Sequence, residues 1–191
     1  MSEPAPRQTL QQRVAAAILD GAAQIFAVQG EQASMNDVAE AAGVARATVY
    51  RYFPNRETLL DELARTAVAD VDARLASARI DEVAPEEGIA RAVRALVDVG
   101  DSFVLLARER LRSDPEPFEL RLSQPLRGLF ERGQASGDIR DDITSARLTE
   151  SLIGLIVGVL TSTPSLGRED MTATITGLFL DGARARGPRR P

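Results

Sequence analysis

Cysteine and histidine are both absent from the 191-residue sequence. Their absence excludes disulfide bonds, thiolate nucleophiles and imidazole bases, and it removes the side chains that most often bind zinc or haem. Tryptophan is absent as well, and the four aromatic residues that follow Phe53 are all phenylalanine. Because an aromatic cage needs several rings around one cation, we do not expect a site for a quaternary ammonium ligand. We expect neither a metal site nor a cofactor.

Long hydrophobic runs are also lacking. The longest apolar run, Leu152–Leu160, is much shorter than the roughly 20 residues that cross a bilayer. The segment Met1–Leu10 is polar and contains prolines, so we expect a mobile arm and no signal peptide. The protein is therefore expected to be cytoplasmic, without a membrane partner.

No segment has the alternating pattern of a β-strand, whereas apolar residues at helical spacing occur along most of the chain. Over Arg13–Gln29 the larger apolar residues lie three or four positions apart, as on one face of a helix. Ser34, with Asp37 three positions later, forms a capping-box pattern that predicts a short helix ending at Gly43. The sequence therefore predicts an all-α fold.

A third helix is predicted over Ala45–Phe53. Pro54 ends this helix, and Asn55 is expected to cap a much longer one, because an asparagine side chain accepts hydrogen bonds from free N–H groups of the next turn. Later apolar stripes include one that Pro125 is expected to kink. With two last helices, about nine are expected in all. We place an N-terminal domain over residues 1–54 and a C-terminal domain over residues 55–191.

The two short helices joined by a glycine have the layout of a helix-turn-helix. The second helix contains Arg46, our first candidate for reading a base, because arginine can form two hydrogen bonds to guanine. Arg51, Tyr52 and Arg56 are better placed to contact phosphates, which fix orientation without reading sequence. For Tyr50 and Tyr52 an alternative stays open, in which one of them only closes the core of the small domain.

The charge of the chain does not follow the usual pattern of a DNA-binding protein. The net charge is −5, whereas nucleic-acid-binding domains usually have a basic surface. Yet residues 44–56 contain three arginines and no acidic residue. The positive charge is therefore concentrated on the predicted DNA-reading helix.

Three segments closely resemble the TetR family of repressors, namely Ile25–Gly30, Ser34–Val44 and Thr48–Leu60. The resemblance implies a three-helix DNA-binding domain followed by a helical domain for ligand binding and dimerisation. It also implies a sequence-specific repressor. Such a protein binds a palindromic operator in double-stranded DNA as a homodimer, and a small-molecule effector releases it.

The DNA-contact positions of the family carry over residue by residue. These positions are occupied by Ser34, Asn36, Arg46, Ala47, Thr48, Tyr50, Tyr52 and Arg56. The chain departs from the family pattern at Ala45, where a serine or a similar cap often begins the recognition helix, and at Glu31 and Ala33. The missing cap costs about 1 kcal/mol of local stability.

The resemblance places an effector cavity among the middle helices. Candidate lining residues are Phe103, Leu106, Phe118, Leu122 and Leu126. A plain apolar core explains these five residues equally well. If they do line a cavity, an apolar ligand that is neutral or acidic is easiest to accommodate.

A dimer is expected because a regulator that reads DNA with two short helices needs a second copy about one helical turn away. The expected dimer helices are Ser145–Ser162 and Glu169–Arg184. Candidate interface residues are Leu152, Leu155, Val159, Ile175 and Leu178. Gly154 and Gly158 also have the spacing that lets two helix backbones approach closely, although this spacing is usually incidental in soluble helices.

Two rival functions are weighed against this interpretation. An enzyme with paired carboxylates would have to use Glu86 with Glu87 or Asp141 with Asp142. Adjacent residues of a helix point about 100° apart and do not converge on one substrate, so we expect no enzyme. The second rival is a helical module that dimerises without binding DNA.

Overall fold

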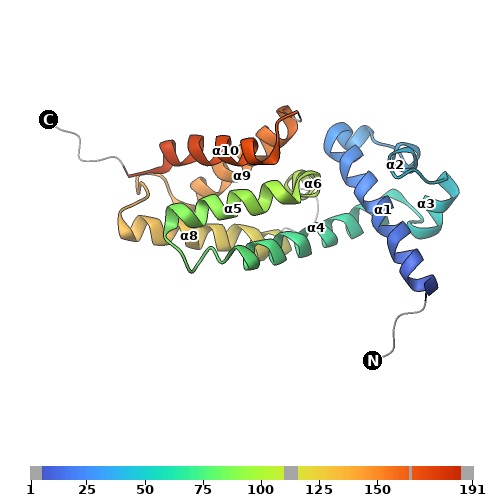
Figure 1. The fold of residues 1–191 in the computed structure, drawn as a ribbon, viewed down its shortest axis with the longest axis horizontal. Helices are drawn as coiled ribbons and strands as arrows, with labels where there is room; N and C mark the ends of the chain where they lie inside the picture. Colours follow the sequence, from blue (N-terminus) through green and yellow to red (C-terminus); the bar gives the residue numbers. More distant parts are fainter. Residues whose placement is uncertain (1–5, 110–115, 164, 186–191) are drawn as a thin grey trace, which may run out of the picture. The chain divides into compact units, whose positions relative to one another are not determined.

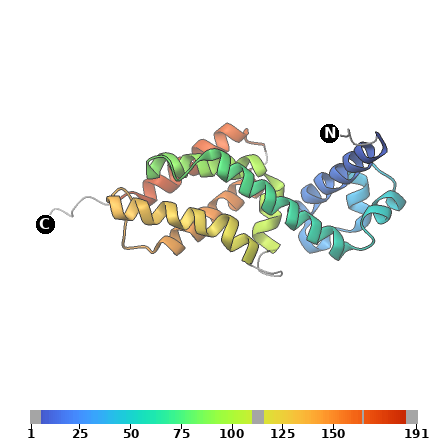
Figure 2. The same ribbon diagram turned by 90° about the horizontal axis from the view of Figure 1, so that it is seen from below.

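The computed structural model describes residues 6–109, 116–163 and 165–185. Within these ranges the regular elements are helices, and Ile139 and Arg184 form an isolated antiparallel bridge. The chain divides into two compact units, residues 1–66 and residues 67–191 (Figure 1). The division falls within the long helix α4 (Arg56–Ala78), which is one continuous helix (Figure 2), beyond the boundary predicted at residue 54. The all-α prediction is confirmed.

The first unit contains α1 (Pro6–Gln29), the short 3-10 helix η1 (Gly30–Gln32), α2 (Met35–Ala41), α3 (Arg46–Tyr52) and the first turns of α4. The largest side chains of its core that have at most 1% exposure are Ile18, Phe26, Val38, Val49 and Leu59. The expectation of a mobile arm up to Leu10 is wrong for residues 6–10, which are helical. Proline suits the first position of a helix because its fixed φ is helical and its missing N–H would lack a partner there anyway.

The second unit contains the rest of α4 and the helices that follow it. These are α5 (Pro85–Val99), α6 (Asp101–Glu109), α7 (Glu116–Phe118), η2 (Glu119–Ser123), α8 (Gln124–Ser136), α9 (Ser145–Ser162) and α10 (Arg168–Ala183). Helices α7, η2 and α8 follow one another without a break, so the described residues form nine helices besides the short η1. The prediction of about nine helices is confirmed.

The segment η2 is a π-helical turn directly before Pro125. A proline inside a helix has no N–H to donate, and its ring collides with the carbonyl group one turn earlier. A π-helical turn widens the helix at this point. The disturbance expected from Pro125 therefore takes the form of a π-helical turn inside a continuous helix.

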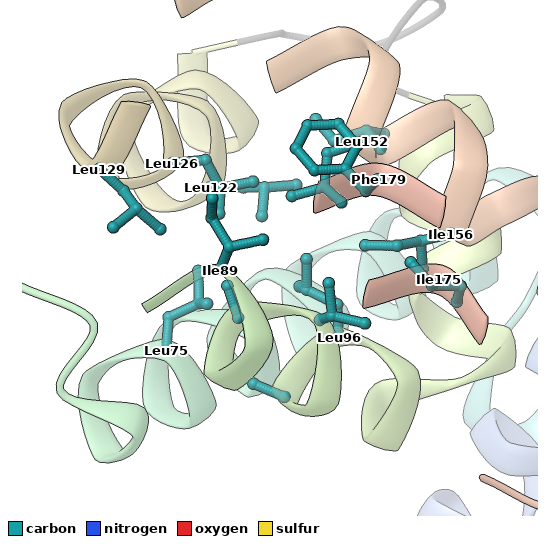
Figure 3. Close-up of a cluster of buried hydrophobic side chains, with 14 of the residues drawn as sticks. Leu75, Ile89, Leu96, Leu122, Leu126, Leu129, Leu152, Ile156, Ile175 and Phe179 are labelled. Carbon is teal, nitrogen blue, oxygen red and sulfur yellow. The ribbon is translucent and has the colours of Figure 1, made fainter. Parts of the chain in front are cut away.

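The core of the second unit is made by apolar side chains from all of its helices. Those labelled in Figure 3 come from α4, α5, η2, α8, α9 and α10 and point toward one another. The labelled residues are Leu75, Ile89, Leu96, Leu122, Leu126, Leu129, Leu152, Ile156, Ile175 and Phe179. All of them are buried. Full burial of one such side chain contributes about 1.5–3 kcal/mol, so this cluster is the main source of stability of the unit.

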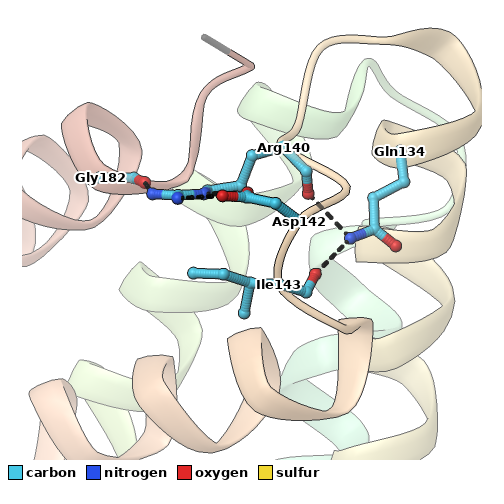
Figure 4. A network of polar contacts seen from close by, with 5 residues as sticks. All are labelled: Gln134, Arg140, Asp142, Ile143 and Gly182. Atoms are coloured by element: carbon cyan, nitrogen blue, oxygen red, sulfur yellow. Dashed lines mark hydrogen bonds and ion pairs between the residues drawn. The ribbon is translucent and has the colours of Figure 1, made fainter.

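Polar contacts fix the connection between α8 and α9 to the end of α10 (Figure 4). The side-chain amide of Gln134 donates to the carbonyl oxygens of Arg140 and Ile143, each at 2.8 Å. Arg140 donates to the carbonyl oxygen of Gly182 at 3.0 Å and pairs with Asp142 at 2.6 Å. A small cavity of about 200 Å³ lies at this connection. The connection is thus held by side chains as well as by the backbone.

In the acidic doublet Glu86–Glu87, each carboxylate has a different partner. Glu86 pairs with Arg184 at 2.7 Å, and Glu87 pairs with Arg91 at 2.9 Å. The hydrogen bonds from Arg184 lower the pKa of Glu86. The carboxylates of this doublet therefore do not act as a pair.

Among the described helices, α9 is long and apolar enough to cross a bilayer by length and composition. Core helices of globular proteins meet the same criterion. Only 28% of α9 is buried within the protein. The side chains of Leu155, Val157, Val159 and Leu160 on this helix are half-buried, so its own chain leaves part of their apolar surface uncovered.

Candidate nucleic-acid interface

The turn between α2 and α3 depends on two glycines. Gly43 has a φ of +65°, in the left-handed region that glycine adopts without strain. On α1, a Cβ atom added to Gly21 would lie 2.7 Å from the backbone nitrogen of Ala42. Gly21 therefore allows α1 to pass close to the end of α2. The sequence analysis did not identify Gly21, because only the crossing of the two helices reveals its role.

The start of α2 is fixed by the predicted capping box. The backbone N–H of Ser34 donates to the Asp37 carboxylate at 2.8 Å, and the N–H of Asp37 donates to the Ser34 hydroxyl at 3.3 Å. The Ser34 hydroxyl also donates to the same carboxylate at 2.7 Å. These bonds from the backbone and side chain of Ser34 lower the pKa of Asp37. Asn36, the other DNA-contact candidate on α2, is exposed.

Helix α3 presents its polar face outward because Val49 and Phe53 anchor it to the core, with 0% and 6% exposure. Four candidate residues are exposed, namely Arg46, Ala47, Tyr50 and Arg51, while Thr48 and Tyr52 are half-buried. Ala45 occupies the N-cap position and makes no side-chain hydrogen bond, as the sequence predicted. The structure thus brings the candidates of α3 together on one outward surface.

Arg46 and Tyr50 form a pair on this surface. The Arg46 guanidinium lies 5.3 Å from the centroid of the Tyr50 ring and donates to the Tyr50 hydroxyl at 3.4 Å. The two residues are one helical turn apart, so they lie above one another on the same face. The arginine predicted to read a base is therefore in contact with a neighbour on its own helix.

A groove of about 600 Å³ lies beside the C-terminal half of α3. It is lined by Leu10, Gln11 and Val14 of α1 and by Arg51 and Tyr52 of α3. The Arg51 guanidinium lies 5.3 Å from the Tyr52 ring centroid. Gln11 was not identified from the sequence, because α1 has no DNA-contact pattern of its own. With Arg51, it gives this groove donors for a phosphate.

Arg56 differs from the other candidates because it faces the inside of the first unit. Its guanidinium lies 4.8 Å from the ring centroid of Phe26 and donates to the Gly30 carbonyl oxygen at 3.4 Å. Its Nε atom is buried and has no hydrogen-bond partner. No local pattern connects Phe26 with Arg56, since thirty positions separate them. The phosphate contact expected of Arg56 stays a prediction.

The five candidate ligand residues of the second unit are all buried. Their exposures are 0% for Phe103, 4% for Leu106, 4% for Phe118, 0% for Leu122 and 0% for Leu126. They belong to the central core cluster. They do not line the groove beside α3 or the cavity at the α8–α9 connection.

The five candidate interface residues fall into two groups. Leu152 and Ile175 have 0% exposure inside the protomer, so they have no surface to offer to a second chain. Leu155 and Val159 are half-buried, and Leu178 is 61% exposed. The helix period alone could not assign Leu152 and Ile175 correctly, because both helices are apolar on more than one face.

Comparison with known proteins shows which protein family the first unit resembles. The sequence model of bacterial regulatory proteins of the tetR family matches residues 18–63, which contain the helix-turn-helix and the start of α4. This part of the chain is therefore similar to the DNA-binding region of the tetR family. Members of the TetR family bind DNA and regulate transcription, and several relatives of this chain are repressors. The predicted family resemblance is confirmed.

Two TetR-family relatives illustrate the extent of the sequence similarity. The chain is 35% identical over 122 residues to the transcriptional repressor LfrR of Mycolicibacterium smegmatis, and the match covers 61% of each protein. It is 28% identical over 164 residues to the transcriptional regulator NfxB of Pseudomonas aeruginosa, covering 82% of this chain and 87% of NfxB. The match to LfrR therefore spans less than two thirds of that repressor.

Solved structures show the TetR fold over most of the chain. The crystal structure of LfrR in complex with proflavine has a TM-score of 0.70 and 22% identity, covering 91% of this chain and 97% of that one. The structure of AibR in complex with isovaleryl coenzyme A and operator DNA has a TM-score of 0.67 and 20% identity, covering 86% and 97%. The likeness establishes the fold of both units.

Proposed function

We propose that the chain is a transcriptional repressor that binds a palindromic operator as a homodimer and leaves it when a small molecule binds to the second unit. The observation that carries the proposal is the outward polar face of α3, with the Arg46–Tyr50 pair at its start. An arginine held in this way can read guanine in the major groove. Arg51 and Gln11 are proposed to contact phosphates, which position the helix.

Dimerisation is proposed through α9 and α10. Exposed apolar surface in a globular protein often marks an interface with another chain. The half-buried Leu155 and Val159 on α9 and the exposed Leu178 on α10 supply such surface. The added Cβ atoms of Gly154 and Gly158 would meet no other atom of the protomer, so a second helix has room at these positions.

Release by an effector is proposed by analogy with relatives. LfrR has been crystallised with proflavine, and AibR with isovaleryl coenzyme A and operator DNA. For this chain we propose an apolar ligand, neutral or acidic, that binds among α5, α6, η2 and α8 near the five candidate residues. A coupling of about 1–3 kcal/mol between ligand and operator is enough to change DNA affinity 5-fold to 150-fold. The protein is proposed to act in the cytoplasm, where its DNA target lies.

Selection of DNA duplexes from a randomised pool tests the proposal. We expect the wild-type protein to enrich an inverted repeat whose half-sites are about one helical turn apart, or a multiple of it. Footprinting of the enriched duplex should show both half-sites protected, and small-molecule fractions of a cell extract should contain one that reverses protection. Enrichment of a single asymmetric site would contradict the dimer. No enrichment at all is the result expected of a helical interaction module that does not bind DNA.

A further inference from the structure

We propose that Arg56 is a positioning residue for DNA binding, which locks the first turn of α4 to the end of α1 and makes no phosphate contact of its own. The lock consists of three groups, namely the Arg56 guanidinium, the ring of Phe26 and the carbonyl oxygen of Gly30. Phe26 is 1% exposed, so the ring is a fixed platform within the core of the first unit. The guanidinium lies over that ring at 4.8 Å.

The position of Arg56 in the sequence is unfavourable for its own helix. It is the first residue of α4, and a positive charge near the N-terminus of a helix opposes the helix dipole. The end of α1 provides the opposite environment. The last carbonyl groups of a helix lack partners and attract cations, and α1 has no basic residue in its own last turn. Arg56 supplies this charge from outside, by donating to the carbonyl oxygen of Gly30, the residue directly after α1. The same oxygen also accepts from the Ala33 N–H at 3.3 Å.

The buried Nε atom of Arg56 also supports a role inside the protein. This atom has no hydrogen-bond partner, so burying it has a cost that an arginine free to extend into solvent avoids. Stacking a planar guanidinium on a ring offsets such a cost, and a lysine ammonium cannot reproduce this geometry. The arrangement therefore depends on arginine itself and not only on a positive charge.

The lock bears on DNA binding because α3 ends close by in the sequence. Helix α3 ends at Tyr52, and only residues 53–55 connect it to Arg56. The four steps from Tyr52 to Arg56 span at most about 14 Å, so fixing Arg56 limits where the end of α3 can lie. Phe53 is itself buried, which shortens the free part of the connection further. Loss of the lock should therefore loosen the C-terminal end of the DNA-reading helix.

The two roles of Arg56 differ in the salt dependence of DNA binding. DNA affinity falls as the salt concentration rises. Each phosphate neutralised by a protein cation makes the slope of log affinity against log salt concentration steeper by about 0.9. We expect the full-length variants R56K and R56Q to bind the selected duplex roughly fivefold more weakly than the wild type, with an unchanged slope. F26L should weaken binding similarly, and the double variant F26L/R56Q should be no weaker than the weaker single variant.

Arg51 provides the matched control, since it is an exposed arginine of α3 beside the groove. R51Q should make the salt dependence less steep, by about 1 in the slope, and R51K should restore the wild-type slope. Circular dichroism shows which variants fold. If R56Q does not fold, the test uses R56K alone.

The outcomes separate the lock from the DNA-binding function on which it rests. If R56K binds the duplex as tightly as the wild type, the lock is overturned, because a positive charge at position 56 would then be enough for DNA binding. The lock is also overturned if R56Q has a less steep salt dependence and R56K restores the wild-type steepness. Arg56 would then contact a phosphate. If the wild-type protein binds no duplex, DNA binding itself fails, whatever the variants do.

Discussion

The Arg46 guanidinium lies over the Tyr50 ring on the outward surface of α3. An arginine that is already held loses less side-chain entropy when it binds a base, so part of the cost of recognition is removed in advance. The sequence predicted that Arg46 faces DNA, and it left open whether Tyr50 does so or closes the core of the small domain. It did not predict that they contact each other, although their spacing of four positions on a helix is the signal for it.

Replacement of Arg46 by alanine tests its assignment as the base-reading residue. We expect R46A to lose about 1–3 kcal/mol of discrimination against a substituted base at one position in each half-site. Binding of the wild-type and variant proteins to a panel of singly substituted duplexes measures this loss. R65A is the control, since Arg65 is an exposed arginine that pairs with Glu62 within α4. Equal discrimination by R46A and the wild type would remove Arg46 from base reading.

Gly21 is a second residue whose role the structure defines. Alanine at this position would bring its Cβ to 2.7 Å from a backbone nitrogen, and backbone yields less easily than a side chain. We expect G21A to lower the free energy of unfolding by about 1–3 kcal/mol. Gly128 of α8 is the matched control, because a Cβ there meets nothing within 4 Å. G128A should be neutral or more stable by up to about 1 kcal/mol, and urea denaturation of both variants compares the two sites.

Interactions between residues that are close in the sequence could be predicted. Interactions between residues that only the fold brings together could not. The Ser34–Asp37 capping box and the uncapped Ala45 follow from spacings of three positions or from a single residue type. Phe26 and Arg56 meet only because α1 and α4 are folded against each other. The sequence pattern suggested a phosphate contact for Arg56, whereas its contacts with the Phe26 ring and the Gly30 carbonyl oxygen required coordinates.

At the level of elements, the capping box should make the stability of α2 depend on pH. The hydrogen bonds from Ser34 lower the pKa of Asp37 below its usual value of 3.8. A carboxylate with a lowered pKa in the folded state stabilises the protein above its unfolded pKa, and this contribution is lost as the pH falls through the folded value. We expect the difference in urea midpoint between the wild type and D37N to shrink between about pH 6 and about pH 3. A difference that stays constant over this range would contradict the role of the Asp37 charge.

Helix ends were predicted well where a local signal marks them. The predicted bounds of α9, Ser145–Ser162, agree with the structure, because Thr144 directly before it is a cap whose hydroxyl accepts from the Arg147 N–H. The start of α1 was placed too late, since the polar residues before Arg13 carry no apolar stripe. The π-helical turn before Pro125 was also beyond prediction, because a proline indicates a disturbance without specifying how the helix absorbs it.

At the level of the whole molecule, the apolar surface of α9 and α10 is the feature that a single chain leaves unexplained. Helix α9 has five buried residues among eighteen, although its sequence is apolar on several faces. Helices α9 and α10 also pack against each other within the protomer. A second copy of the same pair would give a symmetric interface in which each chain covers the other.

Leu178 offers the sharpest test of that interface. Its side chain is 61% exposed in the protomer, so an aspartate there should leave the fold of a single chain intact. In a dimer interface the same carboxylate would be buried without a partner, at a cost of about 3–5 kcal/mol. We therefore expect L178D to sediment as a monomer with unchanged helix content and to bind the selected duplex at least about 100-fold more weakly, because each chain then binds one half-site alone.

Leu120 of η2 is the matched control, since it is also an exposed leucine, at 47%, and lies outside α9 and α10. L120D should stay dimeric and keep the DNA affinity of the wild type. A dimeric L178D with normal affinity would place the interface elsewhere, whereas a monomeric L178D with normal affinity would show that one copy of α3 is enough. The oligomeric state and the DNA affinity vary independently. Together they show where the chains dimerise and whether DNA binding requires the dimer.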